Sequence, residues 1–321
     1  MGGSSYSDDA ADRLYAHRAT VDPSTVFVNK SAMAANLDPK GVKVRESRDS
    51  DAHPESNACA IFFDVTGSMG GIPRQFAMET MPGLMKLLVT RGYLPHPQIF
   101  FGAVGDATSD RAPLQVGQFE SGLEMDECLT SIFIEGNGGG QSSESYEMAL
   151  YFAARHFSID SWEKRGKKPY LFTIGDEMAY KKVDRDLVKK FIGDDIEASI
   201  PLKDMLEEIN SRFEYFHICV NSPSYHDGHH KWWKELLNER ALMLEDPKGV
   251  CELIGLTISA CEGRDIDDAG KDLVDSGLSA SRVDAAKAAL VPFVGAGTAL
   301  RKGTVSGDLQ VSADAGGSRR L

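Results

Sequence analysis

Short apolar runs separated by longer stretches dominate the chain from residue 58 onward. The runs lie at 58–64, 98–106, 170–176 and 213–221. Their hydrophobicity is continuous rather than alternating, which predicts strands buried on both faces, as in a sheet covered by helices. The run 114–119 predicts an edge strand that forms a hairpin with the second of these strands.

Helical periodicity fills the intervals between the runs. One helix face within 144–157 consists of Tyr146, Ala149, Leu150, Ala153 and Phe157. A similar face follows the first strand over 77–88, where Pro82 is expected to bend or break the helix. Further helices are predicted around 232–237 and over 250–260. Strands that alternate with helices predict an α/β domain with a largely parallel sheet.

The two ends of the chain lack the alternation of apolar runs and helical patterns that marks this domain. The N-terminal part is polar, and only a helix over 8–18 and a strand at 25–28 are expected there. After the domain a charged helix is predicted from about 270 to 292, and the Gly/Ser/Asp-rich end is predicted to be disordered. We predict four parts: an N-terminal extension (1–57), the α/β domain (58–263), a helical segment (264–302) and a tail (303–321).

Composition narrows the function classes. With 35 Lys and Arg against 48 Asp and Glu, the 321 residues carry a net charge of −13. This charge argues against binding to nucleic acid or to anionic membranes, which both need clustered cations. No apolar run approaches the ~20 residues of a membrane span, and no signal-peptide pattern starts the sequence. Five cysteines without a C-x-x-C pair predict reduced thiols and a cytoplasmic location.

Aspartates end three of the four main apolar runs. They are Asp64, Asp106 and Asp176. Ligands of open α/β sheets bind beyond the carboxyl ends of the strands, so acids placed there are expected to converge. Asp64 also begins the segment Asp-Val-Thr-Gly-Ser, a D-x-[ST]-x-S pattern between a predicted strand and a predicted helix. Asp106 is expected to cap the hairpin rather than to join the site.

The segment IFFDVTGSM resembles the metal-ion-dependent adhesion site of von Willebrand factor A (VWA) domains. That site is completed by a Gly-rich loop and by an acid after a further strand, which match GNGGGQSSESYEMAL and LFTIGDE here. The resemblance covers about 58–263. It implies a Rossmann-like, doubly wound sheet and a non-enzymatic, metal-dependent protein-interaction module.

The resemblance also implies the ligands. Thr66 and Ser68 would bind the ion directly, and Asp64 and Asp176 directly or through water. Hard oxygen ligands suit Mg²⁺, or else Mn²⁺ or Ca²⁺, rather than Zn²⁺. In the family, an open coordination position commonly accepts an acidic residue of a protein partner.

The third element departs from the family pattern. The position that usually holds Thr falls on Glu144, directly after Ser142 and Ser143. We expect Glu144 to be a ligand or near-ligand, with Ser143 as the alternative; an acid in the first turn of a helix explains Glu144 equally well. Three carboxylates around one divalent ion would leave a local charge of −1 and favour a closed site. The order Gly175-Asp176 is also the reverse of many relatives.

Other interpretations stay open beside this one. The Asp64 loop and GDATSD (105–110) also resemble haloacid-dehalogenase-like phosphotransferases, with Asp64 as nucleophile, although the two motifs are unusually close in sequence. The loop SYHDGHHKWW is expected to be a solvated loop rather than a second metal site. By analogy with intracellular bacterial VWA proteins, the partner could be a MoxR-like AAA+ ATPase or a stress or defence system. A structural assembly subunit is the third alternative.

Overall fold

The computed structural model describes residues 5–22, 25–80, 84, 87–88, 92–136 and 142–305. Within these ranges the largest sheet has six strands in the order β12-β11-β7-β2-β3-β4. All neighbours are parallel except β3 and β4. The strands are β2 (Asn57–Asp64), β3 (Pro97–Val104), β4 (Leu114–Val116), β7 (Tyr170–Gly175), β11 (Glu214–Val220) and β12 (Ala241–Leu244).

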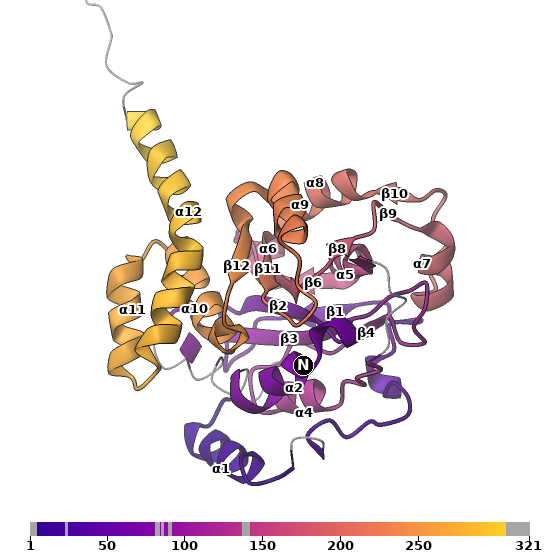
Figure 1. Cartoon of the computed structure of the whole chain (residues 1–321), viewed down its shortest axis with the longest axis horizontal. Helices are drawn as coiled ribbons and strands as arrows, with labels where there is room; N and C mark the ends of the chain where they lie inside the picture. The colour runs from indigo at the N-terminus through magenta and orange to yellow at the C-terminus, as the bar shows by residue number, and fades with distance from the viewer. Residues whose placement is uncertain are drawn as a thin grey trace, which may run out of the picture.

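Helices cover both faces of this sheet (Figure 1). One layer holds α5 (Tyr146–His156), α7 (Arg185–Phe191), α8 (Leu202–Arg212) and α9 (Asp227–Leu237). The other holds α2 (Ile72–Gln75), α4 (Glu124–Thr130) and α10 (Val250–Cys261). The side chains of alternate β2 residues pack against opposite helical layers. Ile61 and Phe63 belong to one hydrophobic cluster, and Ala60 and Phe62 belong to the other. The predicted α/β fold with a doubly wound, mostly parallel sheet is confirmed.

Short strand pairs and helical turns lie outside the main sheet. Three two-stranded pairs occur in the described residues: β1 (Arg45–Ser47) with β6 (Phe157–Ile159), β5 (Ser143–Glu144) with β8 (Met178–Ala179), and β9 (Lys182–Val183) with β10 (Ile200–Pro201). The 3-10 turns are Ala35–Leu37, Gly67–Met69, Asn238–Arg240 and Pro247–Gly249, and Phe76–Thr80 is a π-helix. Helix α6 spans Asp160–Arg165.

The four main strands, the hairpin and the helix over 8–18 agree with the sequence predictions; α1 is Asp8–Arg18. The strand predicted at 25–28 is wrong. Val26 and Phe27 are both buried, so this segment enters the core as a loop with adjacent side chains inside. The strand β12 was not predicted, because four residues give too short a pattern. Pro82, the Gly-rich stretch 137–141 and most of the predicted tail, 306–321, lie outside the described residues.

The single helix predicted from 270 to 292 is also wrong. Two helices are present, α11 (Ile266–Asp275) and α12 (Ala280–Val305), and they are separated at Gly277, which has φ +97°. A positive φ is available to glycine without steric cost, so this residue ends α11. Val283 and Leu290 of α12 are buried in the same cluster as α10, while the end of α12 extends past the body (Figure 1).

The N-terminal extension is fixed to the domain by buried polar contacts. Arg18 of α1 is 8% exposed and forms an ion pair with Asp126 of α4, with Nη1 and Oδ1 2.6 Å apart. The same guanidinium donates to the Ala77 carbonyl of the π-helix at 3.1 Å. A buried charge pair of this kind is costly to break, so α1 is held in one position.

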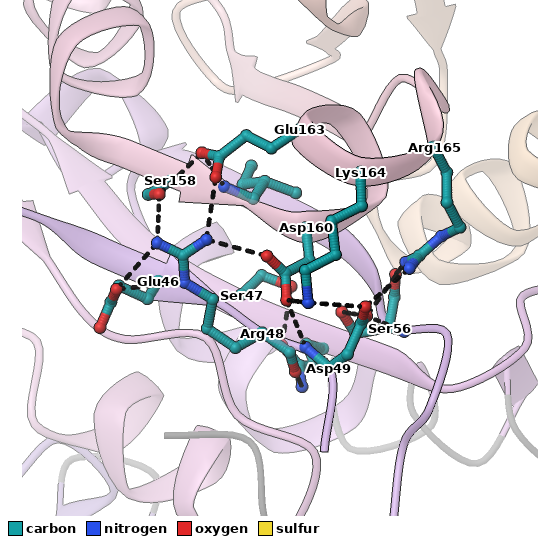
Figure 2. Close-up of polar contacts among 12 residues, drawn as sticks. Glu46, Ser47, Arg48, Asp49, Ser56, Ser158, Asp160, Glu163, Lys164 and Arg165 are labelled. Atoms are coloured by element: carbon teal, nitrogen blue, oxygen red, sulfur yellow. Dashed lines mark hydrogen bonds and ion pairs between the residues drawn. The ribbon is translucent and has the colours of Figure 1, made fainter.

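A second anchor of the extension is a network of ion pairs around Arg48 (Figure 2). Its guanidinium contacts Glu46, Asp160 and Glu163 at 2.9–3.0 Å. Lys164 lies 2.7 Å from Asp160, and Arg165 lies 2.8 Å from Asp49. Four carboxylates therefore share three cations, and we call this group the Arg48 network.

Candidate metal centre

The order in which the chain adds strands to the sheet reverses at β2. The next strand, β3, lies on one side of β2, and the later strand β7 lies on its other side. Asp64 is the last residue of β2, and Asp176 directly follows β7, whose Ile174 pairs with Phe63. The crevice beyond the carboxyl ends at such a switch point is where open α/β sheets bind ligands. The fold therefore places both aspartates at the expected position.

A continuous line of hydrogen bonds joins the four sequence-predicted ligands. The Thr66 backbone N–H and hydroxyl both donate to Asp64 Oδ1, at 2.8 and 2.6 Å. Thr66 Oγ1 lies 3.0 Å from Ser68 Oγ, which donates to Asp176 Oδ1 at 3.0 Å. Asp64, Thr66, Ser68 and Asp176 are thus brought together, and their oxygens face one another.

Two further side chains complete the hydrogen bonding of the aspartates, and the sequence analysis missed both. Tyr146 at the start of α5 donates to Asp64 Oδ2 at 2.7 Å. Ser222, two residues beyond β11, donates to Asp176 Oδ2 at 2.5 Å. The signal for Ser222 was its place after a core strand, where Asp64 and Asp176 were found. Tyr146 was assigned only to the apolar face of its helix.

The reversed order Gly175-Asp176 has a steric explanation. A Cβ at position 175 would lie 1.8 Å from the Tyr146 hydroxyl oxygen and 3.0 Å from Cβ of Asp64. Only glycine leaves room for the phenol to reach Asp64 between β2 and β7. Tyr146 also packs edge-on against His217 and Trp233, whose rings stack 3.8 Å apart.

Glu144 is buried beside this group. Its strand β5 pairs with β8, so Glu144 lies opposite Ala179, two residues from Glu177. Glu144 is 3% exposed, and its Oε2 is buried with no hydrogen-bond partner in the described residues. Burial, followed by repulsion from Asp64 and Glu177, raises the pKa of Glu144 to about 11. Ser143, the alternative ligand, is half-buried on the same strand.

The carboxylates of this region repel one another. Burial and then the charge of Asp176 raise the pKa of Asp64 to about 7. Burial and the charges of Asp176 and Asp64 likewise raise the pKa of Glu177 to about 7. Within the described chain, none of Asp64, Glu144, Asp176 and Glu177 forms an ion pair with a Lys, Arg or His. We call these four residues the Asp64 cluster.

Oxygen donors of this kind fit a hard cation. Two carboxylates and two hydroxyls face one another, and a nearby buried Glu144 oxygen lacks a partner. These are the ligand types that Mg²⁺, Mn²⁺ and Ca²⁺ prefer. No group of three or more His, Cys, Asp or Glu side chains that could hold an ion occurs among the described residues. Besides Asp64 and Asp176, the oxygen donors brought together here are the hydroxyls of Thr66 and Ser68.

The prediction that SYHDGHHKWW is a solvated loop is wrong, because helix α9 begins at Asp227 and buries Trp233. Asp106 and the histidines take part in local hydrogen bonds. Asp106 accepts hydrogen bonds from Thr108, Ser109 and Tyr180, in the loop between β3 and β4. His226 accepts from the Gly228 N–H at the start of α9. The ring nitrogens of His229 and His230 lie 2.7 and 3.2 Å from backbone carbonyl oxygens.

Comparisons with known proteins give structural likeness at low identity. No protein-family model and no curated protein matches the sequence. Among solved structures, a von Willebrand factor type A protein from Catenulispora acidiphila is similar over 64% of this chain and 42% of its own, with 13% identity and TM-score 0.37. The pilus adhesin SpaC from Lactobacillus rhamnosus GG, in its open conformation, is similar over 72% and 33%, with 9% identity and TM-score 0.43.

A second SpaC structure gives 11% identity and TM-score 0.42, over 72% of this chain and 34% of its own. The chain thus spans less than half the length of these structures. Scores this low carry no argument about function, and the fold class rests on the observed strand order. No helix in the described part of the chain combines the length and the apolar character that crossing a membrane requires.

Proposed function

We propose that this protein is a metal-dependent protein-interaction module of the VWA type. The observation that carries the proposal is the line Asp64–Thr66–Ser68–Asp176 at the switch point of the sheet. Four oxygen-bearing side chains from two loops face one another there, and the described chain supplies no cation to the two carboxylates.

The ion would be held by the two hydroxyls and the two aspartates. Glu144, with its unpartnered oxygen, is the further proposed ligand, and Ser143 is its alternative. Mg²⁺ is the ion we propose, and Mn²⁺ or Ca²⁺ would suit the same donors. The bound ion would offset the repulsion between Asp64 and Asp176.

The partner would supply a carboxylate to an open position on the ion. A partner of the MoxR-like AAA+ class, a role in stress or defence and a cytoplasmic location are further proposals from the family resemblance. The metal proposal itself needs only a protein with an accessible acidic residue.

Thermal unfolding in EDTA, Mg²⁺ and Mn²⁺ tests the metal site. An ion that binds only the folded state at ten times its Kd stabilises that state by about 1.4 kcal/mol. We expect a rise in Tm with Mg²⁺ or Mn²⁺ that Ser68→Ala abolishes. Ser211→Ala, on α8, is the matched control and should keep the rise. An equal response of the wild type and Ser68→Ala would contradict the proposed ligands.

A further inference from the structure

The two oxygens of each aspartate in the proposed metal site have different partners. Asp64 Oδ1 and Asp176 Oδ1 each accept the hydroxyl of a proposed ligand. Asp64 Oδ2 accepts from the Tyr146 hydroxyl and Asp176 Oδ2 from the Ser222 hydroxyl. These two donors come from α5 and from the end of β11, outside the two loops that carry the proposed ligands. Each aspartate therefore has one oxygen among the proposed ligands and one oxygen held from elsewhere.

The Tyr146 phenol is tightly packed in the position from which it reaches Asp64. Its side chain is buried, and its ring packs edge-on against His217 and Trp233, with ring centroids 5.2 and 5.7 Å apart. A Cβ at Gly175 would lie 1.8 Å from the phenol oxygen, so the hydroxyl fills the space that this glycine leaves. The phenol thus occupies the side of Asp64 Oδ2 from which an ion would otherwise approach.

Ser222 is fixed in a similar way beside the second aspartate. It is 7% exposed, and its backbone N–H donates to the Val220 carbonyl at 3.0 Å. Its hydroxyl oxygen accepts from the Ser224 N–H at 3.1 Å, so the hydroxyl hydrogen is left for Asp176 Oδ2. A ring nitrogen of His229 lies 2.7 Å from the Asp176 carbonyl oxygen. Both the backbone and the outer oxygen of Asp176 are therefore held.

A carboxylate with one oxygen held by an outside donor can offer only the other oxygen to a cation. Ca²⁺ takes up to about eight oxygens and often binds both oxygens of a carboxylate. Mg²⁺ is smaller and requires about six oxygens in near-octahedral geometry. The two oxygens of one carboxylate are too close together to occupy two corners of that octahedron. The oxygen ligand types here suit all of these ions, but the number of oxygens that each aspartate can offer separates them.

We propose that Tyr146 and Ser222 are positioning residues that set the ion selectivity of the site: they restrict Asp64 and Asp176 to one oxygen each and so favour Mg²⁺ and Mn²⁺ over Ca²⁺. This inference rests on the proposed function, since it concerns the ion that the same residues would hold. Neither residue would be a ligand, and both would act through an aspartate. Groups that orient metal ligands in this way typically change affinity by about tenfold or more when they are removed.

Calorimetric titration of the full-length protein with Mn²⁺ and with Ca²⁺ at pH 8 tests the proposal. The wild type should bind Mn²⁺ more tightly than Ca²⁺. Tyr146→Phe and Ser222→Ala should each weaken Mn²⁺ binding about tenfold and Ca²⁺ binding less than about twofold, because the released oxygen is a further ligand for Ca²⁺. The ratio of the Kd for Ca²⁺ to the Kd for Mn²⁺ should therefore fall about fivefold. Ser222→Thr keeps the hydroxyl and should restore the ratio.

The chain offers matched controls for both substitutions. Tyr151 is on the same helix as Tyr146, and its hydroxyl donates to Asp194 at 2.8 Å, so Tyr151→Phe removes an equivalent hydrogen bond away from the site. Ser211→Ala on α8 removes a hydroxyl that donates to a backbone carbonyl. Both controls should leave the ratio unchanged. Circular dichroism and Tm in EDTA verify folding, and Ser222→Ala carries the test if Tyr146→Phe does not fold.

The selectivity and the metal site can fail separately. If Mg²⁺ or Mn²⁺ raises the Tm through Ser68 but the folded variants of Tyr146 and Ser222 weaken both ions equally, the metal site stands and the proposed role in selectivity is overturned. A wild type that prefers Ca²⁺ to Mn²⁺ would overturn it as well. If the wild type binds neither ion, the proposed function falls and this inference falls with it.

Discussion

Two groups of acidic side chains in this protein are built in opposite ways. In the Arg48 network, Glu46, Asp49, Asp160 and Glu163 meet cations of the same chain (Figure 2). In the Asp64 cluster, Asp64 and Asp176 accept hydrogen bonds from hydroxyl groups, Glu144 and Glu177 each have a buried oxygen without a partner, and the described chain brings no cation to any of the four. An internally neutralised group serves to hold an extension in place. A group left without cations stores repulsion that an external cation can relieve.

The presence or absence of neighbouring cations shifts the pKa values of the two groups in opposite directions. The hydrogen bond from Arg165 holds the pKa of Asp49 well below its usual range. Burial alone would raise the pKa of Asp160, but hydrogen bonds from Lys164, the Asp49 backbone and Arg48 lower it on balance. The pKa values of Asp64 and Glu177 are instead raised to about 7. The two groups should therefore respond in opposite ways to pH.

The largest expected effect is on the pH profile of unfolding in EDTA. An acid with a raised pKa binds more protons when folded, so stability falls as pH rises from about 4 to about 7. For the buried Asp64 the loss over this whole range is about 4 kcal/mol, of which roughly 2–3 kcal/mol falls between pH 5 and pH 8. Mg²⁺ should remove most of this fall, because it replaces the protons. Urea unfolding at pH 5 and pH 8, with and without Mg²⁺, measures it, and a flat profile in EDTA would contradict the repulsion.

The Arg48 network should make stability depend on pH in the opposite direction. Its acids have lowered pKa values, so their stabilisation is present above the unfolded pKa and is lost as pH falls through the folded one. At neutral pH, Asp160→Asn should lower the free energy of unfolding by about 2–3 kcal/mol, since it leaves a hydrogen-bonded charge network incomplete. Chemical denaturation measures this loss. Asp267→Asn, which changes a 78% exposed carboxylate paired with Lys287, should cost under about 1 kcal/mol.

The matching substitution in the other group should have the reverse effect. In EDTA at pH 8, Asp64→Asn removes one of two repelling buried charges, and we expect a gain of about 1–2 kcal/mol. In Mg²⁺ the same variant should be less stable than the wild type, because a ligand is lost. Denaturation in both solutions measures the crossover. A loss of stability in EDTA as large as that of Asp160→Asn would end the distinction between the two groups.

The smallest expected effect concerns Glu144. If its unpartnered oxygen contributes to the ion, Glu144→Gln should weaken Mn²⁺ binding about tenfold, or about 1.4 kcal/mol. Calorimetric titration with Mn²⁺ measures the change, and Ser143→Ala tests the alternative ligand. An unchanged affinity in Glu144→Gln together with a loss in Ser143→Ala would assign the position to Ser143.

Much of the proximity of Asp64, Thr66, Ser68 and Asp176 was predictable because strand ends are visible in a sequence. Continuous apolar runs ending in Asp64 and Asp176 predicted buried strands with acids at their carboxyl ends, and the topology brings those ends together. The Thr66 and Ser68 hydroxyls belong to the same loop as Asp64, so their proximity required little long-range information. Tyr146 and Ser222 reach the aspartates from 82 and 46 residues away in the chain. No local pattern encodes such contacts.

The sequence by itself determined the alternation of strands and helices, the acids at the strand ends and the net charge, because these depend on local periodicity and composition. Only the tertiary structure decided which acids meet cations. Asp49 and Asp160 are 111 residues apart and become neighbours through the Arg48 network, whereas Asp64 and Asp176 meet at the switch point without one. Charge balance within a folded protein depends on contacts between distant segments, and composition alone does not specify them.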